Sequence, residues 1–188
     1  MKLSFHGAAQ TVTGSKFVLE LNNGKNLLLD CGLFQGSGKK SDALNRQWGF
    51  EPSKVYALIL SHAHIDHCGL IPKLVADGFK GKIYCTPATK DLAELLLLDS
   101  ARIQHNDLLY MNKKRERQGK PLLSPLYNEK QVIESLKKFE TKPFNKSFSV
   151  TENVQVLFTD AGHIAGSAVV NLEIVLKRKN KTYLTYSG

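Results

Sequence analysis

Three histidines and one aspartate are concentrated in the segment Ser61-His62-Ala63-His64-Ile65-Asp66-His67, which follows an apolar run. Side chains two residues apart in an extended chain point the same way, so His62 and His64 can face a common point. Asp66 and His67 fall where the next helix is expected to start, and they can approach that point from the other side. Three imidazoles and a carboxylate suit a borderline cation such as Zn²⁺, with manganese and iron as alternatives. The competing interpretation is a surface cluster of histidines that caps a helix.

Two further residues, each placed after a predicted strand, can contribute to this site. His163 lies between glycines in the segment 160–167 and is a candidate third histidine for the first metal, although taken alone it is typical of an ordinary loop residue. Asp30 ends an apolar run, where an acid commonly forms a turn. Its functional interpretation is as a hydrogen-bond acceptor that orients a metal-binding imidazole. His6 and His105 have no partners in the sequence and are interpreted as structural or exposed.

Strands are predicted to carry most of these residues. Residues 55–60 are apolar throughout, as expected of a strand buried on both faces, and ligands of α/β proteins lie at the carboxyl ends of such strands. The turn sequence Asn22-Asn23-Gly24 predicts a hairpin between residues 18–21 and 26–30. Further strands are predicted at residues 82–85, 154–159, 168–176 and 182–186, with a charged turn at 177–181.

Helices are predicted between the strands. Apolar residues with helical spacing at 70–75 are followed by Gly78, where that helix should end. Thr86, followed by proline, predicts the start of a long helix. Asn128 begins a capping-box pattern with a glutamine three residues later, and a second helix should start there. The glycines at positions 32, 36 and 38 indicate a long irregular loop. This order predicts an α/β fold, a mixed sheet with outer helices.

The composition excludes several classes of protein. The chain has 188 residues, of which 42% are hydrophobic and 23% charged, so it is neither disordered, nor collagen-like, nor a small disulfide scaffold. No apolar run is long enough to cross a membrane, and the N-terminus turns polar too early for a signal peptide. Cys31, Cys68 and Cys85 contain no C-x-x-C pair and are expected to be reduced, small hydrophobic residues in or near strands. We therefore expect a soluble, cytoplasmic protein with no membrane partner.

Positive charge is the other compositional feature. The chain has 26 Lys and Arg against 17 Asp and Glu, a net charge of +9 that favours polyanionic partners. A local concentration of basic residues lies at residues 113–120, and the usual interpretation of such a run is a solvated loop.

Three motifs occur in the order and spacing typical of the metallo-β-lactamase fold: Leu29-Asp30-Cys31-Gly32, His62-x-His64-x-Asp66-His67 and Gly162-His163-Ile164-x-Gly166-Ser167. The opening segment, FHGAAQTVTGS at residues 5–15, resembles the β-CASP branch of that family. This branch comprises RNA- and DNA-processing nucleases, including the eukaryotic pre-mRNA 3′-end endonuclease. Two further segments, LLLLDSARIQ at residues 95–104 and Pro125-Leu126-Tyr127, resemble its bacterial and archaeal members. The resemblance covers essentially the whole chain.

The resemblance implies an αββα sandwich and a zinc-dependent ribonuclease. His62, His64 and His163 are then expected to hold a first zinc, and Asp66 and His67 a second. A hydroxide shared by the two ions would attack phosphorus in line and leave a 5′-phosphate. Asp66 would also accept a hydrogen bond from that hydroxide. The catalytic residues implied are thus Asp66 and, as the residue that orients an imidazole, Asp30.

The expected substrate is single-stranded RNA, which the basic residues 113–120 are candidates to help hold. The sequence leaves open whether the nuclease is an endonuclease or an exonuclease, and whether it prefers RNA or DNA. The oligomeric state is also open, with a homo-oligomer among the alternatives.

The family pattern extends beyond the 188 residues. In the family, an aspartate that bridges both metals follows the strand that residues 183–188 resemble. A last histidine ligand, the β-CASP cap with its general-acid histidine and the closing strands come later. We therefore expect residues 1–188 to be an incomplete metallo-β-lactamase domain, inactive alone, with a second zinc position that is weakly held or empty.

Two other functions compete with this interpretation. One is a hydrolase of a small ester, thioester or lactam on the same fold, which has no need of a net charge of +9. The other is a non-catalytic scaffold subunit of an RNA-processing complex. Degenerate subunits lose metal ligands, whereas every ligand expected before Gly188 is present, so a catalytic parent protein is favoured.

Overall fold

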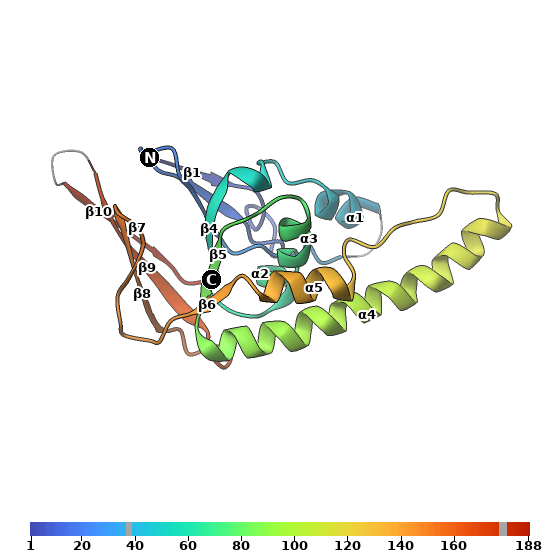
Figure 1. Cartoon of the computed structure of the whole chain (residues 1–188). Coiled ribbons are helices and arrows are strands. Elements are labelled where there is room, and N and C mark those ends of the chain that lie inside the picture. The colour runs from blue at the N-terminus through green and yellow to red at the C-terminus, as the bar shows by residue number, and fades with distance from the viewer. Residues whose placement is uncertain (37–38, 177–179) are drawn as a thin grey trace.

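Two β-sheets face each other, and the helices lie on the outer side of the first sheet (Figure 1). The computed structural model describes residues 1–36, 39–176 and 180–188. The first sheet contains, in spatial order, β1 (Lys2–Phe5), β2 (Phe17–Glu20), β3 (Asn26–Leu29), β4 (Val55–Ile59), β5 (Lys82–Cys85) and β6 (Phe139–Thr141). The second sheet contains, in spatial order, β10 (Lys181–Tyr186), β9 (Ala168–Val175), β8 (Val154–Asp160) and β7 (Phe148–Thr151).

The first sheet is mixed and the second is antiparallel. Strands β1, β2 and β3 pair in antiparallel fashion, as the predicted hairpin requires, and Gly24 supplies the positive φ of 81° at its turn. From β3 to β6 the pairing is parallel, which brings the carboxyl ends of these strands to one edge of the sheet. In the second sheet every pairing is antiparallel.

Alternate residues of the central strands point into two separate apolar cores. Leu28 and Leu58 pack with the helices, whereas Leu27, Leu29 and Ile59 pack against the second sheet. Because successive side chains of a strand point to opposite faces, a continuously apolar strand is required between two cores. The α/β fold class predicted from the sequence is therefore confirmed, with one helical layer and two facing sheets in the described residues.

The helices are α1 (Lys39–Arg46), α2 (Ile65–Cys68), α3 (Ile71–Ala76), α4 (Pro87–Arg117) and α5 (Glu129–Leu136), with a short 3-10 helix η1 (Pro52–Lys54). Both predicted caps are present. The Thr86 side chain accepts a hydrogen bond from the Thr89 amide, and Asn128 and Gln131 form a reciprocal capping box.

Several predictions for loops and strands are wrong. Helix α1 begins inside the region predicted to be an irregular loop, of which Gly38 lies outside the described residues. The basic run at 113–120 is helical as far as Arg117, because Lys, Arg and Glu are good helix formers. Strands β6 and β7 were not predicted. Of the charged turn predicted at residues 177–181, positions 177–179 lie outside the described residues.

The cysteines are free and buried, as predicted, although Cys68 lies in α2 rather than near a strand. Burial raises the pKa of the Cys31 and Cys85 thiols to about 12, which keeps both protonated and unreactive. Among the helices of the described ranges, none combines the length and hydropathy needed to cross a membrane.

Candidate metal centre

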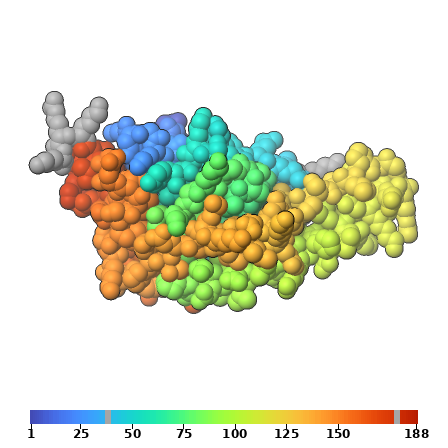
Figure 2. All heavy atoms as spheres, viewed as in Figure 1, coloured from blue at the N-terminus to red at the C-terminus, as the bar shows by residue number. Residues whose placement is uncertain are grey.

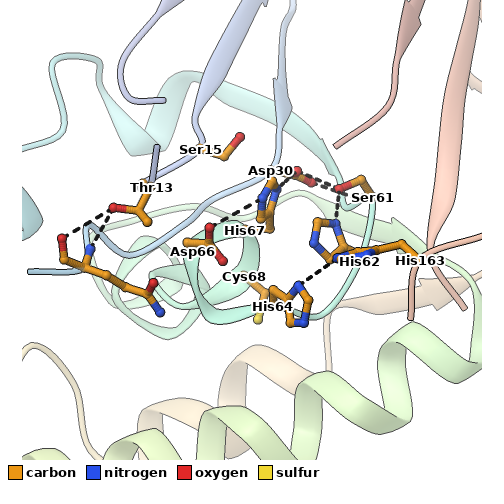
Figure 3. Close-up of polar contacts among 12 residues, drawn as sticks. Thr13, Ser15, Asp30, Ser61, His62, His64, Asp66, His67, Cys68 and His163 are labelled. Atoms are coloured by element: carbon orange, nitrogen blue, oxygen red, sulfur yellow. Dashed lines mark hydrogen bonds and ion pairs between the residues drawn. The ribbon is translucent and has the colours of Figure 1, made fainter. Parts of the chain in front are cut away.

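The four histidines of the sequence pattern meet at the edge where β3 and β4 end. His62 and His64 follow β4, His67 lies in α2, and His163 comes from the loop between β8 and β9 (Figure 3). Asp30 follows β3 and lies fully buried beneath them. Three segments far apart in the sequence thus supply one cluster, at the carboxyl ends of parallel strands where α/β folds place ligands.

Backbone hydrogen bonds fix the position of α2. Three consecutive carbonyl oxygens of this helix, those of residues 65–67, accept hydrogen bonds from the amides of Leu33, Ser15 and Cys31, at 2.9, 2.9 and 2.7 Å. Gly32 makes this close approach feasible, because a Cβ at that position would lie 1.5 Å from the Asp66 carbonyl oxygen. The sequence around the first hairpin therefore determines where Asp66 lies.

The loop that carries His163 is held by the start of α4. The hydroxyls of Thr86 and Thr89 both donate to the Gly166 carbonyl oxygen, at 2.6 and 2.8 Å. Within the loop, the Ser167 hydroxyl accepts from the Ile164 amide at 2.7 Å. The cap of the long helix therefore also positions a candidate metal ligand.

His62, His64 and His163 form one compact group of possible ligands. Their ligand atoms all lie within 4.8 Å of one another, and the separation of His163 Nε2 from His64 Nδ1 is 3.1 Å. Two nitrogens that share a tetrahedral zinc at 2.0–2.1 Å lie about 3.3 Å apart. The imidazole group thus has the size and the donor type that fit a zinc ion.

A hydrogen-bond network around the buried Asp30 carboxylate assigns the ring protons of His62 and His67. Asp30 Oδ2 receives bonds from His67 Nδ1 at 2.7 Å, from the Ser61 hydroxyl at 2.7 Å and from the Tyr186 hydroxyl at 2.6 Å. Its Oδ1 accepts from the Ser61 amide at 2.7 Å. Because Ser61 has given its one proton to Asp30, its oxygen accepts from His62 Nδ1, 2.9 Å away.

These assignments leave Nε2 of both His62 and His67 as lone-pair donors. His67 Nε2 lies 3.7 Å from Asp66 Oδ2, so the two side chains form a second pair of possible ligands. Asp30, His62 and His67 also lie close enough to share an ion. The oxygens of Asp30 already accept four hydrogen bonds, one of them from His67 Nδ1, which is a contact of the kind that the hypothesis of an acceptor orienting an imidazole requires.

Burial and neighbouring charges separate the titration of these imidazoles. Burial, together with the charges of the other three histidines, lowers the pKa of His62 to about 4. For His67 burial also acts to lower the pKa, but the hydrogen bond and charge of Asp30, with the charge of Asp66, outweigh it and raise the pKa. His62 is thus a neutral imidazole at cellular pH, the form that binds a metal.

A buried lysine supports the same region. Lys16 is 0% exposed, and its ammonium donates to the carbonyl oxygens of Gly14 and Gly32 at 3.1 and 3.0 Å. It also lies 4.1 Å from the centroid of the Phe34 ring. Burial lowers the pKa of Lys16 to about 8. The lysine thus joins the segment before β2 to the glycine that packs on α2.

The structure places the predicted site residues together and adds others. His62, His64, Asp66, His67, His163 and Asp30 all lie in the cluster. His105 is exposed on α4 and His6 packs on Phe50, both apart from the cluster, as predicted. Sequence reasoning missed Ser61 and Tyr186, which no spacing signal links to Asp30. It also missed Ser15, whose hydroxyl lies 2.8 Å from that of Tyr186.

The sequence of this chain is similar to those of several known proteins. A sequence model of the metallo-beta-lactamase superfamily matches residues 12–107. Ribonuclease TTHA0252 of Thermus thermophilus is 34% identical over 189 residues, which covers 100% of this chain and 37% of the relative. Transcription termination factor FttA of Methanothermobacter thermautotrophicus is 32% identical over 184 residues, 97% of this chain and 27% of the factor. The chain therefore spans little more than a third of these relatives at most.

Solved structures share the fold at lower sequence identity. A B3 metallo-beta-lactamase with an active-site glutamic acid matches with a TM-score of 0.52 and 12% identity. The match covers 93% of this chain and 56% of that enzyme. MEM-A1, a subclass B3 metallo-beta-lactamase from a soil metagenome library, matches with a TM-score of 0.50 and 17% identity, over 93% of this chain and 56% of that one. At such identities the likeness concerns the fold alone.

Proposed function

Because this chain belongs to the metallo-β-lactamase superfamily, we propose that it is the N-terminal part of a zinc-dependent phosphodiesterase that hydrolyses single-stranded RNA. The observation that carries the proposal is the group of three imidazoles from two separate segments, His62, His64 and His163, with ligand atoms within 4.8 Å of one another. The full-chain similarity to a protein named as a ribonuclease supports RNA as the substrate. The net charge of +9 agrees with a polyanionic substrate.

His62, His64 and His163 would hold the first zinc, and Asp66 with His67 the second. When bound, zinc supplies a Lewis acid and a nucleophile at neutral pH. His62 contributes a neutral imidazole because burial and its histidine neighbours lower its pKa to about 4. Asp30 holds His67 through a 2.7 Å hydrogen bond to Nδ1 and thereby keeps Nε2 directed at the cluster. Asp66 Oδ2 is the acceptor that would aim the attacking group.

The chain is proposed to be an incomplete domain of a longer protein. The chain covers only 37% of the length of ribonuclease TTHA0252 and 27% of that of the termination factor FttA, which supports this proposal.

RNA hydrolysis tests the proposal, with the chain compared with the polypeptide that its reading frame encodes beyond Gly188. We expect hydrolysis to 5′-phosphate products by the longer polypeptide and none by the 188-residue chain. His64→Ala should abolish hydrolysis, whereas the matched variant His105→Ala, changed at an exposed histidine of α4, should keep it. A stop codon after Gly188, or hydrolysis that survives His64→Ala, would contradict the proposal. Hydrolysis of small esters or lactams instead of RNA would favour the alternative substrate class.

A further inference from the structure

The far end of α4 extends beyond the body of the protein. Helix α4 runs from Pro87 to Arg117, and its second half projects away from both sheets (Figures 1 and 2). At a rise of 1.5 Å per residue, Tyr110 and Arg117 lie about 20 and 30 Å along the axis from Leu96, which packs on the core near α2. This end is thus well separated from the metal centre.

One face of this projecting end carries a tyrosine among cations. Lys113, Lys114 and Arg117 follow Tyr110 by three, four and seven residues, which places all of them within about 60° of it around the axis. Tyr110 is 77% exposed, and the three basic residues are also exposed. We call these four residues the Tyr110 strip.

The opposite face of the helix is occupied. Asn112 exchanges two hydrogen bonds with the backbone of Leu123, at 2.8 and 2.9 Å, and Arg115 donates to the Pro121 carbonyl oxygen at 2.6 Å. The chain that returns towards α5 therefore packs on that face and leaves the strip open to solvent.

The cations of the strip lack an acidic partner among the residues that the structure describes. Within residues 1–36, 39–176 and 180–188, no ion pair involves Lys113, Lys114 or Arg117. Glu116, three residues after Lys113, lies about 120° around the axis from Tyr110 and forms no ion pair in the described part of the chain, and Asp107 lies one turn closer to the body. Cations at the end of a helix stabilise its dipole, but that effect does not require an exposed aromatic ring among them.

We propose that the Tyr110 strip binds single-stranded RNA, with the tyrosine ring stacked on a base and the three cations in contact with phosphates. An aromatic ring flanked by cations is the arrangement by which proteins hold single strands without reading their sequence. The inference rests on the proposed function, since RNA is the proposed substrate. The strip lies about 20–30 Å along the helix axis from Leu96, which packs on the core. The strip is thus a second point of attachment for RNA that is held at the metal centre.

The test is binding of a labelled 15-nucleotide single-stranded RNA to the 188-residue chain, measured by fluorescence anisotropy at several salt concentrations. EDTA is present throughout, so the outcome does not depend on zinc or on hydrolysis, and failure of the proposed activity leaves this test unaffected. The variant Lys113→Gln/Lys114→Gln/Arg117→Gln should lower the slope of log affinity against log salt by about 2, since each phosphate contact on a single strand contributes about 0.7. At 0.1 M salt this corresponds to an affinity about 100-fold lower.

Tyr110→Ala should weaken binding about 5- to 150-fold without changing the salt slope, and Tyr110→Phe should retain it. The matched control, Lys2→Gln/Lys54→Gln/Lys181→Gln, removes the same charge from exposed lysines paired with acids elsewhere. Circular dichroism checks that each variant keeps its helix. RNA affinity of the strip variant equal to that of the control, or of Tyr110→Ala equal to that of the wild type, would overturn the inference.

Discussion

Substitution of Lys16 by methionine should change how the stability of the protein depends on pH. Lys16 is fully buried, and burial lowers its pKa from the ordinary 10.5 to about 8 in the folded state. Between pH 8 and pH 10.5 the unfolded chain binds more protons at Lys16 than the folded chain does. The contribution of Lys16 to the free energy of unfolding therefore rises with pH. The folded and unfolded pKa values differ by about 2.5, and each pKa unit corresponds to about 1.36 kcal/mol. The contribution of Lys16 to the free energy of unfolding should therefore rise by about 3 kcal/mol from below pH 8 to pH 10.5.

The assay is urea denaturation at several pH values from 6.5 to 10.5, for the wild type and Lys16→Met. The quantity of interest is the wild-type minus variant free energy of unfolding, because other groups that titrate in this range then largely cancel. Only the change of this difference with pH reports on the titration of Lys16, because the variant also loses two hydrogen bonds to carbonyl oxygens. Lys2→Met, a substitution at an exposed lysine, controls for net charge. A difference that stays flat, or falls, between pH 8 and 10.5 would refute the reasoning.

Three further substitutions test how the cluster is held. Asp30→Asn should lower the pKa of His67 in metal-free protein, measured by NMR titration, because burial is then no longer outweighed by a carboxylate; an unchanged titration would exclude that role for Asp30. Gly32→Ala should displace α2, since its Cβ would lie 1.5 Å from the Asp66 carbonyl oxygen, and cost about 3 kcal/mol in denaturation experiments as well as zinc affinity. Thr86→Ala should lower the free energy of unfolding by about 1 kcal/mol through loss of the helix cap, and Thr86→Ser should restore it. Equal unfolding midpoints for wild type and Thr86→Ala would contradict that assignment.

Elements with strong local signals could be predicted from the sequence. The capping box at Asn128 and the threonine–proline pair at Thr86 located two helix starts, because caps depend only on residues a few positions apart. The apolar run at 55–60 located the central strand. The histidine and aspartate pattern that follows it located side chains that the structure brings into one cluster, because its members are near neighbours in the sequence.

Features that depend on distant residues could not be predicted in this way. Tyr186 reaches Asp30 across 156 positions, and neither residue carries a sign of the other. Helix α1 was missed because its sequence, KKSDALNR, has almost no apolar stripe. The end of α4 was interpreted as a loop for the same reason. Its helix is held by bonds from Asn112 and Arg115 to a returning segment that only the folded chain reveals.

Zinc content tests the central claim most directly, namely that His62, His64 and His163 hold a metal ion. Elemental analysis of the purified chain after dialysis should find one tightly held zinc per molecule. Zinc should be lost in His163→Ala and retained in His105→Ala, a histidine of α4 outside the cluster. Equal zinc content in wild type and His163→Ala would contradict the claim. Two tightly held ions would contradict the expectation that the second position is incomplete in these 188 residues.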